Sequence, residues 1–239
     1  MAGFKNLIAD SVWKVARNLI RDYSELELLQ TGSNNDRFLE RSVFKAKENF
    51  HNELEFFRFA SIQFSDSFEL PTKDGVHILI NPIDGIKNLA KGFPFFASTI
   101  LQIKRQDGVN NVVASVMSFP ALGQIFYAEL GQGGWMEKYE DSGRAAGRRL
   151  RVSGTKDLAQ SLTSKSFAEK YETQNSRDFG SSSYDIASYT SGKLDGILIK
   201  SDDVIHKLAL ELFAKESGGM VRTLENGDLV ASNTYLLGK

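Results

Sequence analysis

The chain has 239 residues, with 29 basic and 30 acidic side chains, three histidines and no cysteine, which gives a formal net charge of −1. A balance so close to zero gives no overall electrostatic reason to bind nucleic acid or an anionic membrane. The lack of cysteine excludes disulfides, cysteine-ligated zinc, iron–sulfur clusters and thiol nucleophiles. The composition is ordinary for a globular protein, and we expect a cytoplasmic one. Its chemistry must come from carboxylates, hydroxyls or backbone groups.

The N-terminal part predicts two helices. Apolar residues recur at three- and four-residue spacing between Leu7 and Tyr23, which predicts a helix with one apolar face. A Gly- and Asn-rich loop follows at residues 31–37, and a second helix is expected from about Leu39 to Phe59. The inward-facing side chains of this second helix are expected to be Phe44, Phe50, Leu54 and Phe57. Charged residues interrupt the apolar N-terminus, which therefore predicts neither a signal peptide nor a membrane span.

The central part of the chain predicts a sheet. Apolar runs predict strands at residues 76–80, 95–104, 112–119, 124–129 and 134–138. Turns rich in Gly, Asp and Pro separate the last four runs, which therefore predict an antiparallel meander. The first run is expected to stop at Asn81-Pro82, because this dipeptide is a turn signal.

From about residue 158 the pattern alternates between helix and strand. Helices are expected at residues 184–192 and 204–217, and strands at 195–200, 220–224 and 230–232. Asp202 and Asp203 stand where they could cap the second of these helices. The whole chain predicts one α+β unit over residues 1–239, with an antiparallel-sheet half at 1–155 and an α/β half at 156–239.

Residues 81–88, Asn-Pro-Ile-Asp-Gly-Ile-Lys-Asn, are the most informative segment. They predict a strand that ends, turns and enters a helix near Lys87. At such a junction the N–H groups of Gly85 and Ile86 could bind an anion. Asp84 beside them could hold a divalent cation against a phosphate. The alternative is a plain strand–turn–helix in which Asp84 is the N-cap, and this segment alone leaves both open.

Further motifs follow in order: Gly92–Phe96, Gly133-Gly134, Arg148–Ser153, Phe179–Ser181, Asp185–Ala187, Gly192–Gly196 and Glu216–Gly219. Together with residues 81–88 they resemble the inositol monophosphatase family, and within it the bacterial extragenic-suppressor branch, over nearly the whole chain. The resemblance implies a layered α-β-α-β-α sandwich of the inositol monophosphatase and fructose-1,6-bisphosphatase type. It also implies a homodimer that hydrolyses inositol or sugar phosphates with Mg²⁺.

The resemblance assigns metal-ligand positions, and several of them carry altered residues. They correspond to Asn81, the Ile83 carbonyl, Asp84, His206 and an upstream acid matched by Asp66 or, less well, by Glu69. Asn81 lacks the charge of the aspartate it replaces, and the nitrogen of His206 suits Zn²⁺ better than Mg²⁺. We therefore expect weak or absent Mg²⁺ binding. His206 is interpreted as a hydrogen-bonded surface or interface histidine in preference to a ligand.

The positions that would activate water and bind substrate differ from the family as well. The resemblance places the water-activating pair at Val43 and Ile86, which are both apolar here, so no activated water is expected. Replacing both partners of a hydrogen bond by apolar groups leaves no buried polar group unpaired. The phosphate positions are Gly85 and Ile86, and the substrate positions are Gly180, Ser181 and, for a carboxylate that reads substrate hydroxyls, Ile199 or Lys200.

Three functional hypotheses follow. The first is a family member with weak or no phosphatase activity that is retained as a binding or regulatory homodimer. The second is a divergent, active metal-dependent inositol or sugar phosphate phosphatase that uses Asp84, Asp66 and His206. The third is a sensor that binds a small phosphorylated ligand at the Gly85, Ile86 and Gly180-Ser181 groups without cleaving it. The resemblance implies a protein partner from the transcription machinery, and the charge balance and the lack of a long apolar run predict no membrane association.

A basic cluster at Arg144, Arg148, Arg149 and Arg151 has no place in these hypotheses. It is interpreted as a solvated face or a guard on a strand edge, in preference to a nucleic-acid contact.

Overall fold

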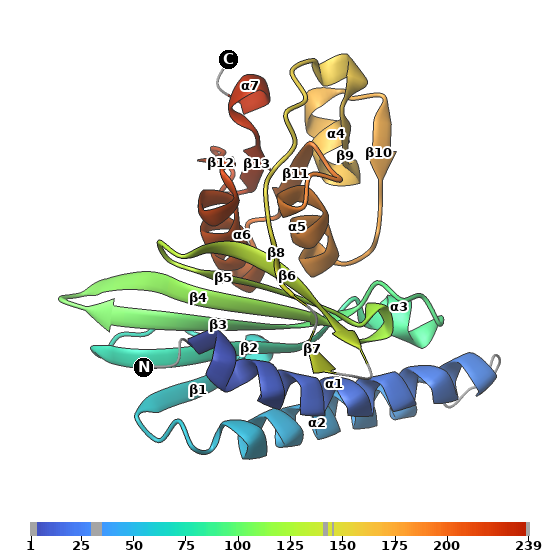
Figure 1. The fold of residues 1–239 in the computed structure, drawn as a ribbon, viewed down its shortest axis with the longest axis vertical. Helices are drawn as coiled ribbons and strands as arrows, with labels where there is room; N and C mark the ends of the chain where they lie inside the picture. Colours follow the sequence, from blue (N-terminus) through green and yellow to red (C-terminus); the bar gives the residue numbers. More distant parts are fainter. Residues whose placement is uncertain (1–3, 30–34, 141–142, 145, 238–239) are drawn as a thin grey trace.

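The computed structural model describes residues 4–29, 35–140, 143–144 and 146–237, and Figure 1 shows alternating layers of helix and sheet. The first part of the chain contains α1 (Phe4–Leu29), α2 (Asn35–Leu54), β1 (Ala60–Phe64), β2 (Gly75–Asp84), α3 (Ile86–Ala90), β3 (Ala97–Gln106), β4 (Val109–Phe119), β5 (Gln124–Glu129), β6 (Gly133–Glu140), β7 (Gly143–Arg144) and β8 (Arg148–Arg149). The second part contains β9 (Leu162–Ser164), α4 (Lys165–Tyr171), β10 (Asn175–Arg177), α5 (Ser182–Thr190), β11 (Gly196–Ile199), α6 (Val204–Ser217), β12 (Met220–Thr223), β13 (Leu229–Ser232) and α7 (Thr234–Leu237). Within these ranges, no helix has the length and apolarity that crossing a membrane requires.

The strands form two sheets. The first has the order β1-β2-β3-β4-β5-β6-β7, with β8 also paired to β6. From β2 to β6 each strand runs antiparallel to the next one along the chain, which confirms the predicted meander. β1 was not predicted, and it pairs parallel with β2. The second sheet has the order β10-β9-β11-β13-β12, so the chain leaves the first sheet before it enters the second.

Three groups of buried side chains hold the layers together. Alternation along β2 sends Leu79 to one face of the first sheet and Ile78 and Ile80 to the other. Leu79 packs in the largest group, with α5, α6 and the inner face of the second sheet. Ile78 and Ile80 pack against α1 and α2. Phe167 of α4 and Leu237 of α7 cover the outer face of the second sheet. The layers visible in Figure 1 therefore confirm the predicted α-β-α-β-α sandwich.

The second helix differs from its prediction. α2 begins inside the predicted loop and ends at Leu54, and the chain then turns into β1. Phe50, Leu54 and Phe57 are buried as predicted, but Phe44 is 61% exposed. Phe44 lies six residues before Phe50, which places it about 120° away around the helix axis. The two side chains therefore cannot share one inward face.

The predicted stop at Asn81-Pro82 is also wrong, because β2 continues to Asp84. The pairing of β2 with β3 becomes irregular between Asn81 and Asp84. Pro82 falls in this irregular stretch, where the missing N–H breaks no regular ladder bond. The Pro82 carbonyl instead accepts a hydrogen bond from Ser98 Oγ at 2.7 Å. This irregularity carries Asp84 to the edge of the layer formed by α5 and α6.

Gly196 of β11 lies where the second sheet packs closely against α4. A Cβ at this position would lie 2.6 Å from two ring carbons of the buried Phe167. We expect Gly196→Ala to lower the free energy of unfolding by about 1–3 kcal/mol, because overpacking displaces fixed neighbours. Gly154→Ala is the matched control, since nothing lies within 4 Å of a Cβ there. Urea denaturation measures both variants, and equal stabilities would contradict this account of the packing.

Candidate functional site

Asp84 lies where β2 ends and the chain turns toward α3. Its side chain is 14% exposed. Oδ2 of Asp84 accepts hydrogen bonds from Ser181 Oγ at 2.6 Å and from the backbone N–H of Ser183 at 2.8 Å. Ser181 is the N-cap of α5 and Ser183 lies in its first turn. The Asp84 carboxylate therefore occupies the kind of helix N-terminus that binds anions.

Gly85 allows the turn that orients Asp84. Gly85 has a left-handed φ of 73°, and a Cβ there would lie 2.5 Å from the carbonyl oxygen of Phe95. Gly85 is the N-cap of α3, and no side chain caps this helix. The alternative in which Asp84 caps α3 is therefore wrong. The predicted strand–turn–helix junction itself is confirmed.

His206 lies in the first turn of α6 and is 2% exposed. Its Nδ1 is 2.6 Å from Oδ1 of Asp203, and its Nε2 is 2.9 Å from Oγ of Ser183. Nε2 also lies 3.6 Å from Oδ2 of Asp84. His206 is thus hydrogen-bonded as interpreted from the sequence, but its burial corrects the expectation of a surface or interface location. Asp203 is the N-cap of α6, as predicted, and accepts from the backbone N–H of His206.

These contacts favour a protonated His206. Burial by itself lowers the pKa of this imidazole, but the charge of Asp84 and the hydrogen bond to Asp203 outweigh burial and raise the pKa. Burial likewise raises the pKa of Asp203, but the hydrogen bond from His206 outweighs it and lowers the pKa. The imidazole of His206 therefore lies between two carboxylates inside the protein, and both raise its pKa.

The order Asp203–His206–Ser183 is that of a nucleophilic triad, but the geometry does not support such chemistry. Ser183 is fully buried, and its Oγ also shares a hydrogen bond with Thr99 Oγ1 at 2.8 Å. A nucleophile must reach the reacting atom of a substrate, and this hydroxyl is enclosed on all sides. The three residues instead join α5, α6 and β3.

Asp185 completes what we call the Asp84 cluster, namely Asp84, Ser181, Ser183, Asp185, Asp203 and His206. Burial raises the pKa of Asp185 to about 8, and the charges of Asp84 and Asp178 add to this effect. Its buried Oδ1 has no hydrogen-bond partner among the described residues. The sequence identifies Asp185 as part of a family motif and Asp203 as a helix cap, and it contains no signal for Ser183.

The predicted upstream metal ligand makes a different contact. Asp66 lies after β1 and its side chain is 62% exposed. Its Oδ2 is 2.5 Å from Nζ of Lys47 on α2, and this hydrogen bond lowers the pKa of Asp66. Glu69, the weaker match, is exposed and bonds Gln63 Oε1 through its backbone N–H. Each of the two predicted acids thus has a local role near β1.

Val43 and Ile86, the positions of the water-activating pair, do face one cavity. This cavity has a volume of about 540 Å³ and is also lined by Leu39, Glu40, Phe44 and Lys47. Neither Val43 nor Ile86 carries a side-chain donor or acceptor. The structure therefore brings the two positions together, and neither of these two side chains can itself orient a water molecule.

The remaining predicted positions divide between surface and core. Gly180 has a φ of 64° and precedes Ser181, whose hydroxyl bonds Asp84. Ile83 and Ile199 are 8% and 3% exposed and belong to the buried groups. Ile199 therefore offers nothing to a substrate. Lys200 is the other candidate for the position that reads substrate hydroxyls, and its Nζ lies 3.7 Å from Oδ2 of Asp228.

Comparison with known proteins agrees with this architecture. A profile described as the Inositol monophosphatase family matches residues 10–239. The inositol-1-monophosphatase of Rhizobium meliloti (strain 1021) is 26% identical over 263 residues, which cover 97% of this chain and 92% of the relative. The Nus factor SuhB of Escherichia coli (strain K12) is 28% identical over 183 residues, which cover 70% of this chain and 61% of the relative.

Solved structures share the fold. The crystal structure of extragenic suppressor protein suhB from Bartonella henselae superposes with a TM-score of 0.74 at 24% identity, covering 97% of this chain and 94% of the other. The Thermotoga maritima IMPase gives a TM-score of 0.73 at 23% identity, covering 95% and 91%. With the family profile matching almost its full length, the chain belongs to the inositol monophosphatase family.

This family generally depends on Mg²⁺, and the donor set of this chain does not fit that ion. Mg²⁺ requires near-octahedral oxygen ligands. One oxygen of Asp84 already accepts two hydrogen bonds, and both ring nitrogens of His206 are engaged. Among the described residues, no three His, Asp or Glu side chains are arranged to hold a metal ion. The imidazole of His206, with its raised pKa, instead lies beside Asp84.

The Asp84 cluster predicts a pH dependence of stability. His206 and Asp185 both have raised pKa values in the fold, so the folded chain binds more protons than the unfolded chain near neutral pH. Their contribution is fully present below the unfolded pKa values and is lost as pH rises through the folded ones. We expect the free energy of unfolding to fall between about pH 5 and pH 8. Urea denaturation across this range measures it.

The variant Asp185→Asn separates the contribution of Asp185 to this pH dependence from that of His206. The amide is neutral at all these pH values, so this variant should show a shallower fall than the unmodified chain. Asp74→Asn is the control, since Asp74 is exposed and lies outside the Asp84 cluster. A fall that is equally steep in all three proteins would contradict the role assigned to Asp185.

Proposed function

We propose that this chain is an inositol monophosphatase family member with weak or no phosphatase activity, retained for a binding or regulatory role. The observation that carries the proposal is the engagement of Oδ2 of Asp84 and both ring nitrogens of His206 by Ser181, Ser183 and Asp203. Groups that are already hydrogen-bonded and charge-balanced gain little by exchanging their partners for a hydrated metal ion.

The apolar pair supports the same conclusion. A hydrolase of this kind needs a positioned water, and general-base assistance contributes about 10²–10⁴-fold to such a reaction. Val43 and Ile86 line one cavity, and neither of the two side chains has a polar atom. Lys47, the cation at this cavity, pairs with Asp66. The apolar pair supports the proposal that this site activates water poorly, as the hydrogen-bonded Asp84 and His206 support weak Mg²⁺ binding.

A divergent active phosphatase is the alternative, and a specific observation favours it. The Asp84 side chain keeps 14% exposure, and only its Oδ2 carries the hydrogen bonds described above. Its other oxygen could contribute to a single metal ion, with Asp66 and His206 as the further ligands of this hypothesis. This alternative requires Asp66 to leave Lys47 and His206 to leave Asp203 or Ser183.

One assay decides between the two. We expect hydrolysis of inositol 1-phosphate with Mg²⁺ or Mn²⁺ to proceed well below the range of about 1–10³ s⁻¹ that is typical of enzymes. Phosphate release by the purified full chain is measured alongside Asp84→Asn, which keeps an oxygen acceptor for α5 but removes the negative charge. A turnover within the typical range contradicts the main proposal. If Asp84→Asn abolishes that turnover, the alternative is correct.

We also propose that the chain acts as a homodimer, with a transcription-machinery protein as partner and a small phosphorylated ligand. The relatives named Nus factor SuhB support the choice of partner, and the family supports the dimer. Sedimentation equilibrium of the purified chain should give twice the mass of one chain. A monomer at micromolar concentration would contradict the dimer.

A further inference from the structure

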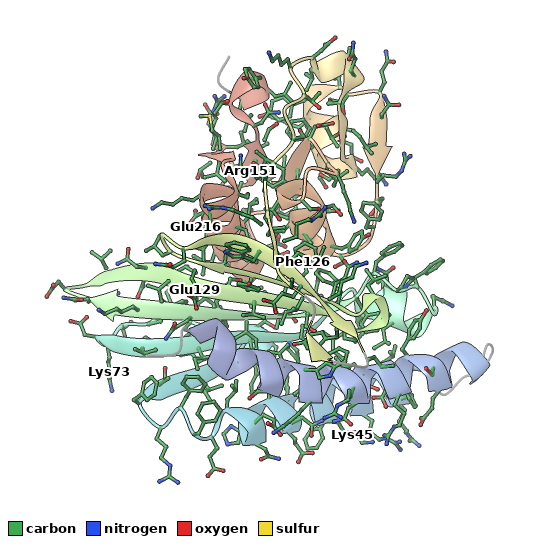
Figure 2. The ribbon with its side chains drawn as sticks, in the orientation of Figure 1. Lys45, Lys73, Phe126, Glu129, Arg151 and Glu216 are labelled. Atoms are coloured by element: carbon green, nitrogen blue, oxygen red, sulfur yellow. The ribbon has the colours of Figure 1, made fainter. Side chains whose placement is uncertain are left out.

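A basic groove lies between residues 149–152 and the C-terminal end of α6. It has a volume of about 520 Å³, and its polar lining comes from Arg149, Arg151, Lys215, Glu216 and Ser217. Arg151 and Glu216 lie close together in Figure 2, well away from Lys45 and Lys73. The groove contains two of the four arginines of the basic cluster; the side chain of Arg144 lies outside the described residues.

The chain presents the two groove arginines on one face. Leu150 between them is 1% exposed and packs in the largest core group, whereas Arg149 and Arg151 are exposed. Successive residues of an extended chain face opposite sides, so burial of Leu150 turns both arginines outward. The Arg149 guanidinium is held 5.8 Å from the ring centre of Trp135. Lys215 approaches from the last turn of α6.

Arg149, Arg151 and Lys215 have no carboxylate partner among the residues that the structure describes. Exposed lysines elsewhere do pair, as Lys14 does with Glu53 and Lys165 with Asp178. Within the part of the chain that the structure describes, Arg149, Arg151 and Lys215 make no ion pair. Three unpaired cations around one concave surface concentrate positive potential, although the chain as a whole is near neutral.

The acid in the groove is already occupied. The two carboxylate oxygens of Glu216 accept hydrogen bonds from the backbone N–H groups of Gly131 at 2.8 Å and Gly133 at 2.7 Å. Carbonyls at the end of α6 are engaged too, since Ser217 O accepts from Val152 N and Ala214 O accepts from Gly219 N. The Glu216 carboxylate is therefore held at the edge of the first sheet by two backbone hydrogen bonds, while Arg149, Arg151 and Lys215 make no ion pair among the described residues.

We propose that this groove binds a small oligophosphate, meaning two or three linked phosphate groups, either inorganic or at the end of a nucleotide. The cations stand on two separate segments, so a short chain of phosphates can reach them together better than a single phosphate can. Arginine forks bind phosphate oxygens in pairs, and lysine adds a point charge. The volume is that of a small-molecule site. The inference is independent of the proposed function, because it uses no residue of the Asp84 cluster.

Isothermal titration of the full chain with tripolyphosphate, in a metal-free buffer, tests the site. We expect saturable binding that weakens as salt is added. The double variant Arg151→Gln/Lys215→Gln should weaken binding about tenfold or more, because each of the two substitutions removes a cation that would make charge-assisted hydrogen bonds to the phosphates. Lys45→Gln/Lys73→Gln is the matched control, because it removes the same charge far from the groove and should bind like the unmodified chain. ATP in place of tripolyphosphate shows whether the source is inorganic or a nucleotide.

Several outcomes would overturn the proposal. One is the absence of binding at millimolar tripolyphosphate, and another is equal weakening by the control pair. Orthophosphate that binds as tightly as tripolyphosphate would remove the case for linked phosphates. A single-stranded RNA that binds more tightly would indicate a nucleic-acid surface instead. Loss of tripolyphosphate binding in Asp84→Asn would place the ligand at the Asp84 cluster, whereas unchanged binding supports the groove whether or not the chain hydrolyses phosphate esters.

Discussion

The hydrogen bonds from the first turn of α5 to the Asp84 carboxylate join the two halves of this molecule. Asp84 ends a strand of the first sheet, and its donors Ser181 and Ser183 lie almost one hundred residues later in the chain. His206 of α6 approaches the same carboxylate, so the two helices of the middle layer meet the first sheet at one charged point. Elsewhere these layers are held mainly by apolar packing, which has no direction of its own, and by the hydrogen bonds from Gly131 and Gly133 to Glu216. The Asp84 cluster supplies the direction, because charge-assisted hydrogen bonds require specific donors at specific distances.

The same interaction explains why family membership does not decide the chemistry of this chain. A helix N-terminus and a nearby carboxylate can cooperate to hold a metal ion and a phosphate, but here the carboxylate itself fills the helix N-terminus. The imidazole of His206 lies beside the same carboxylate, which raises the pKa of the ring. Function depends on the site more than on the fold, and in this chain the groups of the site are paired with one another.

Long elements with clear periodicity were predictable, while short or irregular ones were not. α6 was predicted to the residue, and the antiparallel meander was predicted with small errors at its ends, because both carry repeating apolar patterns over many residues. β9 and β10 have three residues each, too few to show a period. The passage of β2 through Pro82 was missed because the local sequence indicates a turn, and only pairing with β3 continues the strand. Apolarity alone predicts a buried Phe44, but its angle around α2 turns this side chain toward solvent.

The sequence by itself determined which chemical groups this chain can use. It showed an amide at Asn81, an imidazole at His206 and apolar side chains at Val43 and Ile86, and these identities hold in any fold. Only the tertiary structure decided the partners of those groups. It placed Asp203 and Ser183 on the ring nitrogens of His206, gave Asp66 to Lys47, and left Arg149, Arg151 and Lys215 around one groove. The physical reason is that pKa values, metal affinity and phosphate affinity depend on charges and donors within a few ångströms, and residues far apart in sequence supply most of these.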